Sequence, residues 1–185
     1  MYPPMTSKEP SEPSEFVVTV PAPFGLDLAA RFGARTTLGV LTEIFASAKE
    51  RVIVGAPFIQ GKAALHAGPL GMALIASLKR GVRIDLIGTA AGLADVDVRA
   101  LRNVPAARIR IFQPRKNMLA PKVLGSHAKF CLADERRAYI GSANFTEKGI
   151  SGHLEMGVLL KGAQARQVWD FTNALLDSDY MVEHA

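Results

Sequence analysis

The chain has 185 residues, 49% of them hydrophobic and 21% charged, which suits one globular domain. It contains no apolar run near the roughly 18 residues that a membrane helix needs, and its N-terminus lacks the apolar core of a secretory signal. Its one cysteine, Cys131, excludes an internal disulfide and favours the reducing cytoplasm, where we expect the protein to act. We expect the thiol to fill space in the core.

Residues 1–15 form a distinct N-terminal segment. They contain four prolines together with serines and glutamates, a composition that buries too little apolar surface to order itself. The segment carries a net charge of −2, so the whole-chain charge of +5 leaves +7 on residues 16–185. We therefore expect a disordered tail at 1–15 and a single folded domain at 16–185.

Strands and helices alternate along the rest of the chain. Thr36 is placed to be an N-cap for the first helix, and the second helix lies between Pro69 and Gly81, which favour a helix start and a helix end. The segment 52–58 is apolar throughout, as in strands buried on both faces. Further strands are predicted at 16–20, 82–87, 108–112, 127–133, 138–142 and 154–160, and helices at 36–48, 69–79, 97–102 and 164–177.

This alternation predicts an α/β fold with helices on both faces of a central sheet, an α/β/α sandwich. The strands 127–133 and 138–142 are joined by a short polar turn and must be antiparallel, so the central β-sheet is mixed. On the last helix, Trp169 and Phe171 are expected to face the core.

A basic run precedes the predicted hairpin. No acidic residue occurs between Asp97 and Asp134, and a run of one sign is typical of proteins that bind polyanions. Some of these side chains could instead line the solvated face of a strand, notably Arg108 and Arg110. The candidates for binding nucleic acid are the three cations of the loop that follows, Arg115, Lys116 and Lys122.

The stretch Ser126–Asn144 concentrates side chains that suit a phosphate site. His127 and Lys129 are two residues apart, and so are Ser142 and Asn144. Side chains at i and i+2 of a strand project from the same face. We therefore expect an imidazole, an ammonium, a hydroxyl and a carboxamide to converge from the two strands of the hairpin.

These residues, in the pattern H-x-K-x4-D-x6-G-S-x-N, resemble the signature of the phospholipase D superfamily. Asp134 and Gly141 occupy its fixed acidic and glycine positions, and Glu155 stands where members carry an acidic residue after the signature. The resemblance implies an α/β/α sandwich and phosphodiesterase activity. The sequence departs from the pattern at His153, where members often have asparagine.

The residue types suggest a mechanism. His127 would attack phosphorus to give a phosphohistidine, and Lys129 and Asn144 would hold the non-bridging oxygens. Ser142 would bond the phosphate or steady His127, and Glu155 would orient a histidine. Asp134 is expected to be structural, pairing with a basic residue or capping backbone N–H groups.

No metal or other cofactor is needed for this chemistry. His127 and Cys131 are the one pair with a spacing that metal ligands use, and it is a weak zinc match. The motif could also be a decayed structural copy, although every polar position holds a chemically competent residue.

The chain contains one copy of the signature. The other histidines, His66, His153 and His184, lack a lysine two residues on. The resemblance implies two signatures per active site, so we expect a homodimer in which one His127 attacks and its mate protonates the leaving oxygen. The compact bacterial nucleases with one signature, which work as homodimers, are the subgroup that the chain most resembles.

The substrate is left open by the signature. The short basic chain favours a nuclease that cleaves DNA or RNA, with no membrane partner. Other proteins of a DNA-processing or defence system are candidate partners by analogy with such modules. A lipid phosphodiesterase would need an apolar entrance, which the segment 117–121 alone suggests. A third alternative is a subunit that binds nucleic acid without cleaving it. Strand preference and cleavage polarity have no sequence signal here.

Overall fold

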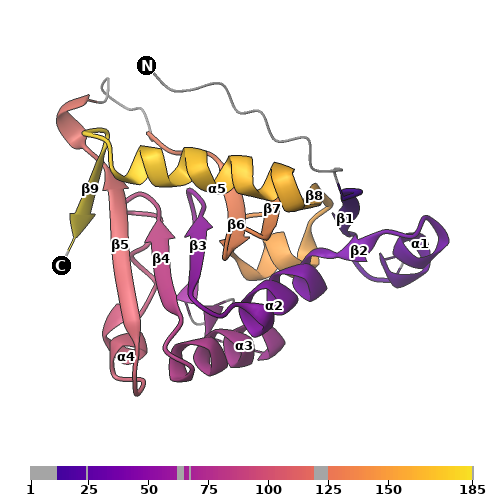
Figure 1. Cartoon of the computed structure of the whole chain (residues 1–185). Coiled ribbons are helices and arrows are strands. Elements are labelled where there is room, and N and C mark those ends of the chain that lie inside the picture. Colours follow the sequence, from indigo (N-terminus) through magenta and orange to yellow (C-terminus); the bar gives the residue numbers. More distant parts are fainter. Residues whose placement is uncertain (1–11, 24, 62–64, 67, 119–124, 185) are drawn as a thin grey trace.

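The computed structural model describes residues 12–23, 25–61, 65–66, 68–118 and 125–184. They form one mixed sheet of nine strands in the order β2-β1-β8-β7-β6-β3-β4-β5-β9 (Figure 1). The strands are β1 (Glu15–Thr19), β2 (Arg35–Thr36), β3 (Arg51–Gly55), β4 (Arg83–Ile87), β5 (Arg108–Pro114), β6 (Lys129–Ala133), β7 (Arg137–Gly141), β8 (Glu155–Lys161) and β9 (Met181–His184). The helices are α1 (Gly25–Arg31), α2 (Thr37–Ser47), α3 (Gly68–Lys79), α4 (Val98–Arg102) and α5 (Gly162–Leu176), with short turns of 3-10 helix at η2 (Lys116–Met118) and of π-helix at η3 (Lys148–Gly152).

Helices cover both faces of the sheet, which confirms the predicted α/β/α sandwich. The larger core packs α2 and α3 against one face, and the smaller core packs α5 across the other face (Figure 1). Each residue of β3 is buried, so both of its faces contribute to a core, as its uninterrupted apolar sequence indicates. Thr36 caps α2 as predicted, because its hydroxyl accepts the N–H of Gly39 at 3.2 Å.

The sheet topology brings several strand ends to one edge. β3, β4 and β5 are parallel and neighbouring, so their carboxyl ends coincide. β6 runs antiparallel to β3, with Phe130 opposite Gly55, and its first residues therefore lie at this same edge. The hairpin partner β7 ends there, and β8 begins there. We call this end of the sheet, which carries the residues predicted to be catalytic, the catalytic edge.

Several sequence predictions need correction. His127 precedes β6, while Ser142 and Asn144 follow β7, so none of the three lies within a strand of the structure, although strands were predicted to carry them. Phe171 is 68% exposed rather than in the core, whereas Trp169 packs against the smaller core. α1, β2 and β9 were not predicted. His184 belongs to β9, which pairs with β5.

The N-terminal boundary lies one residue earlier than predicted. Glu15 is the first residue of β1, and its carboxylate forms ion pairs with Arg35 and Lys161. Glu15 was assigned to the tail because residues 1–15 as a whole are rich in proline, serine and glutamate. The remainder of the predicted tail up to residue 11 lies outside the described residues.

A buried ionic cluster ties the middle of the sheet to α5. Asp85 is fully buried in β4 and accepts hydrogen bonds from Arg51 at 2.6 Å and from Arg110 at 2.7 Å. The Arg51 guanidinium also lies 5.3 Å from the centre of the Trp169 ring. Burial lowers the pKa of Arg51, whereas the bond to Asp85 raises the pKa of Arg110. Arg110 therefore has a structural role in place of the polyanion contact considered from the sequence.

Candidate active site

His127 and Lys129 meet at the catalytic edge. Lys129 opens β6 opposite Gly141, and its Nζ lies 3.1 Å from Nδ1 of His127. The same ammonium donates to the His127 carbonyl oxygen at 2.9 Å. Burial lowers the pKa of Lys129, and the carboxylate of Glu155 acts in the opposite direction. The exposed imidazole is therefore held beside a cation, although it lies outside the strand.

Ser142 is fixed against the start of β8. Its hydroxyl donates to a carboxylate oxygen of Glu155 and accepts the N–H of Met156 at 3.1 Å. Its own N–H donates to the Met156 carbonyl at 3.0 Å. Glu155 therefore bonds to Ser142 in this structure, and its proposed bond to a histidine stays a prediction.

Position 141 requires a glycine because Tyr139 and Met156 leave no room for a Cβ. A Cβ at this position would lie 2.3 Å from the hydroxyl oxygen of Tyr139 and 2.9 Å from the carbonyl oxygen of Met156. Tyr139 is completely buried, and burial raises its pKa. The glycine thus lets the turn before Ser142 pass over a packed aromatic ring.

Asn144 is positioned by segments that the sequence analysis missed. Gly149 of η3 packs on the Asn144 backbone so closely that a Cβ there would lie 2.4 Å from the Asn144 carbonyl oxygen. Gln60 donates its N–H to the Phe145 carbonyl at 2.8 Å, and its side chain accepts the N–H of Glu147 at 3.1 Å. These contacts join residues far apart in sequence, so no local pattern predicts them.

Asp134 lies at the opposite end of the hairpin from the catalytic edge. It has a positive φ of 49° in the turn between β6 and β7. Its carboxylate accepts three backbone N–H groups at the start of β3, from Lys49 at 2.6 Å, Glu50 at 3.1 Å and Arg51 at 2.8 Å. This geometry is the N–H capping that the sequence suggested, and it joins the hairpin to the centre of the sheet.

Among the described residues, the cations of the basic run lie at both ends of the sheet. Arg115 and Lys116 follow the carboxyl end of β5 and lie at the catalytic edge, where Arg115 donates to the Asp179 carbonyl at 2.8 Å. The cations of α4 and the first residue of β5 lie at the other end of the sheet. Lys122 lies outside the described residues.

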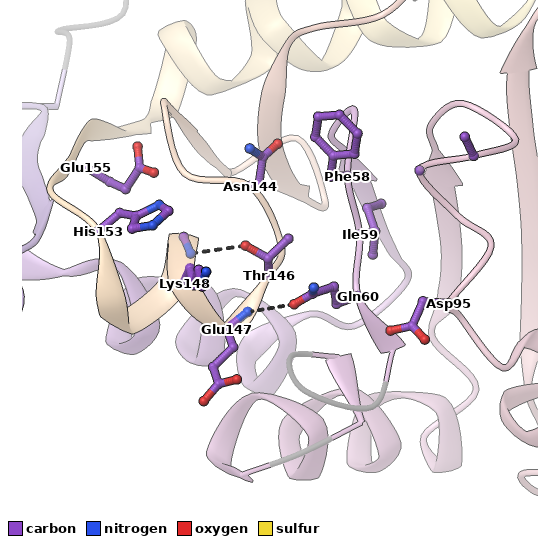
Figure 2. Close-up of a pocket in the computed structure, with 13 residues that line it drawn as sticks. Phe58, Ile59, Gln60, Asp95, Asn144, Thr146, Glu147, Lys148, His153 and Glu155 are labelled. Carbon is purple, nitrogen blue, oxygen red and sulfur yellow. Dashed lines mark hydrogen bonds between the residues drawn. The ribbon is translucent and has the colours of Figure 1, made fainter.

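A cavity of ≈ 650 Å³ adjoins the motif (Figure 2). Asn144 of the motif and Glu155, which follows the motif, both line the cavity. The remaining lining comes from the segments after β3 and β4 and from the chain around η3. These other residues are Phe58, Ile59, Gln60, Ala91, Gly92, Asp95, Thr146, Glu147, Lys148, Gly149 and His153.

The described part of the chain contains neither a metal-binding cluster nor a membrane-spanning helix. Within the described ranges, no three histidine, cysteine, aspartate or glutamate side chains lie close enough together to hold a metal ion. Cys131 is fully buried in the larger core, as expected, and burial raises the pKa of its thiol. No described helix has both the length and the apolar character to cross a bilayer.

The chain matches a protein-family model and several solved structures. The family model described as "Cardiolipin synthase, PLD-like domain" matches residues 41–174. A search of curated proteins found no significant match.

Several solved structures are similar to the chain. NucT from Helicobacter pylori has a TM-score of 0.62 and 15% identity, covering 90% of this chain and 98% of that one. Nuc from Salmonella typhimurium, a phospholipase D family member, has a TM-score of 0.61 and 16% identity, with 93% and 99% covered. Phosphatidylserine synthase from Haemophilus influenzae Rd KW20 has a TM-score of 0.63 and 13% identity, with 92% and 39% covered. At such identities the likeness shows a shared fold.

Proposed function

This chain belongs to the phospholipase D superfamily of phosphodiesterases, and we propose that it is a metal-independent nuclease, acting on DNA or RNA at a site shared by two copies. The observation that carries the proposal is the pairing of the exposed His127 imidazole with the Lys129 ammonium. A nitrogen nucleophile beside a fixed positive charge is what attack on an anionic phosphodiester requires.

The reaction would proceed in two steps. A ring nitrogen of one His127 forms a bond to phosphorus, the bond to the leaving oxygen breaks, and the second His127 gives its proton to that oxygen. Water then attacks phosphorus, passes a proton to the now neutral second imidazole, and the phosphorus–nitrogen bond breaks. Lys129, with its positive charge, and Asn144, with its amide N–H groups, would stabilise the charge that develops on the non-bridging oxygens.

A shared site accords with an exposed apolar surface beside this half-site. Phe16, Val158 and Ile140 are cross-strand neighbours on β1, β8 and β7, and Met156 lies next to them on β8. All four are exposed. α5 covers the Ala138 end of this face and leaves uncovered the end next to the catalytic edge. Contiguous exposed apolar patches mark interaction sites, and the incomplete site indicates that the occupant is a second copy.

Nucleic acid is the favoured substrate on grounds of charge and size. Residues 16–185 carry +7, and Arg115 and Lys116 stand at the catalytic edge. The chain spans nearly the whole length of Nuc and NucT but 39% of the phosphatidylserine synthase. A lipid phosphodiesterase remains the alternative, because a phospholipid presents the same phosphodiester group.

The first experiment compares wild type with His127→Ala on single- and double-stranded DNA, on RNA and on phospholipid vesicles, each with EDTA. We expect nucleic-acid cleavage that resists the chelator and disappears in the variant. A His127→Ala protein that cleaves at the wild-type rate would refute the catalytic role. Binding of nucleic acid without cleavage by wild type would indicate a binding subunit.

A mixing experiment tests the shared site. Wild type and His127→Ala are unfolded together in equal amounts and refolded, so that subunits pair at random. If each site needs both histidines, about one quarter of the wild-type activity returns, since one pair in four is fully wild type. Independent sites would return about one half. Met156→Glu should be a monomer in sedimentation analysis and should lack activity. Phe171→Glu, which places the same charge on the exposed surface of α5, is the matched control and should remain an active dimer.

A further inference from the structure

The cavity beside Asn144 has a composition unlike that of a phosphate site. Three carboxylates, those of Asp95, Glu147 and Glu155, line it together with one ammonium, that of Lys148. Counting His153 as neutral, its formal charge is −2, so a second phosphate would be repelled. The cavity instead offers acceptors for N–H donors.

The wall also provides an aromatic surface and an unmatched acceptor. Phe58, in the segment after β3, is 47% exposed and faces the region of Asn144 in Figure 2. The side-chain oxygen of Asn144 is buried and has no hydrogen-bond partner among the described residues. A buried acceptor of this kind is costly unless a ligand satisfies it. A flat ring that carries amino groups meets both requirements.

Most of the cavity wall is polar. Gln60, Asp95 and Lys148 line the cavity together with Phe58. An acyl chain would find little apolar surface here, so the lining argues against a lipid tail. Nucleobases have a ring face that stacks on aromatics and edges that bond to carboxylates and amides.

We propose that this cavity receives the unpaired nucleobase next to the scissile phosphate, stacked on Phe58 with an amino group facing Asp95. The inference rests on the proposed nuclease function and adds a substrate class, single-stranded nucleic acid. A base inside a duplex is stacked on its neighbours and cannot enter the cavity without leaving the helix. Adenine and cytosine present an exocyclic amino group, and thymine does not, so thymine is the poorer occupant.

The test measures kcat/KM for two matched oligonucleotides, one with bases and one with abasic sugars throughout. Phe58→Ala should lower kcat/KM on the single-stranded DNA by about 5- to 100-fold, with a far smaller loss on the abasic strand. Phe58→Tyr should retain most of the activity, because it keeps the ring. Phe171→Ala, which removes another exposed ring, is the control and should change neither value.

Base identity supplies a second measurement. Asp95→Asn should reduce the ratio of oligo-dC to oligo-dT cleavage, since aspartate accepts from the cytosine amino group. Equal losses on DNA and abasic strands in Phe58→Ala would overturn the proposal and point to a structural role. A wild-type preference for duplex DNA would also overturn the proposal. Cleavage of phosphatidylcholine vesicles but not of oligonucleotides would overturn it as well. Cleavage of oligonucleotides unaffected by Phe58→Ala would refute the base site alone and leave the nuclease function standing.

Discussion

Asp134 is the residue of the signature that we expect to stabilise the fold without taking part in catalysis. Its carboxylate accepts three backbone N–H groups, the shortest from Lys49 at 2.6 Å. A hydrogen bond to a charged group contributes about 1.5–3 kcal/mol, less where water can replace it. The bonds to Lys49 and Glu50 are exposed and the bond to Arg51 is partly buried. We therefore expect the set to contribute about 3 kcal/mol.

Two substitutions separate the parts of this contribution. Asp134→Ala loses all three bonds and places alanine at a φ of 49°, which adds roughly 1 kcal/mol. Its free energy of unfolding should fall by about 4 kcal/mol, which lowers the Tm by about 8–16 °C. Asn tolerates positive φ and keeps one oxygen for Glu50 and Arg51. The free energy of unfolding of Asp134→Asn should therefore fall by only about 1–1.5 kcal/mol.

The assay is urea unfolding followed by circular dichroism, together with turnover measured well below the Tm. Both Asp134 variants should retain wild-type turnover per folded molecule, because Asp134 lies at the far end of the hairpin. His127→Ala is the converse control, with turnover lost and the free energy of unfolding changed by less than about 0.5 kcal/mol, as for an exposed side chain. A stable Asp134→Asn protein without activity would refute this division of the motif.

Three further predictions concern the packing and titration of the site. Because burial lowers the pKa of Lys129 from its ordinary 10.5, its ammonium should deprotonate at a lower pH than that of a free lysine, and kcat/KM should fall as the pH rises through this pKa. Lys129→Arg should move this alkaline limb to higher pH, and identical limbs would contradict the assignment. Gly141→Ala should lower the free energy of unfolding by about 1–3 kcal/mol, because the added Cβ overpacks against Tyr139. Adding Tyr139→Phe should restore part of this free energy, and an unchanged Tm in Gly141→Ala would contradict the steric argument. Cys131, which is completely buried, should resist a thiol reagent until the protein is unfolded, and rapid labelling of native protein would be inconsistent with the structure.

The sequence predicted the parts of this site that depend on local spacing. The i, i+2 offset brings His127 and Lys129 into contact, even though His127 lies before the strand. The antiparallel hairpin was predictable from its short polar turn, and it places Ser142 beside the start of β8. The uninterrupted apolar sequence of β3 likewise predicted that the strand is buried on both faces.

The parts that escaped prediction depend on contacts distant in sequence. Gln60 has no distinguishing local pattern, yet it fixes the chain on both sides of Thr146. Arg110 alternates with apolar residues as a solvated side chain would, but it points toward the buried Asp85. Phe171 was placed in the core on composition, although α5 turns it outward. Side-chain direction in these cases is set by tertiary packing.

The pairing of β1 with β8 has a consequence for folding. Thr19 at the end of β1 bonds through its hydroxyl to the carbonyl oxygens of Gly149 and Ile150, 130 and 131 residues away. Loop closure over such separations is slow, so this part of the sheet should assemble late. Until β1 docks, β8 presents an open strand edge beside exposed apolar side chains, a combination that promotes aggregation. Proteolytic loss of β1 should therefore leave a chain that aggregates during refolding, whereas cleavage before Glu15 should leave this pairing intact.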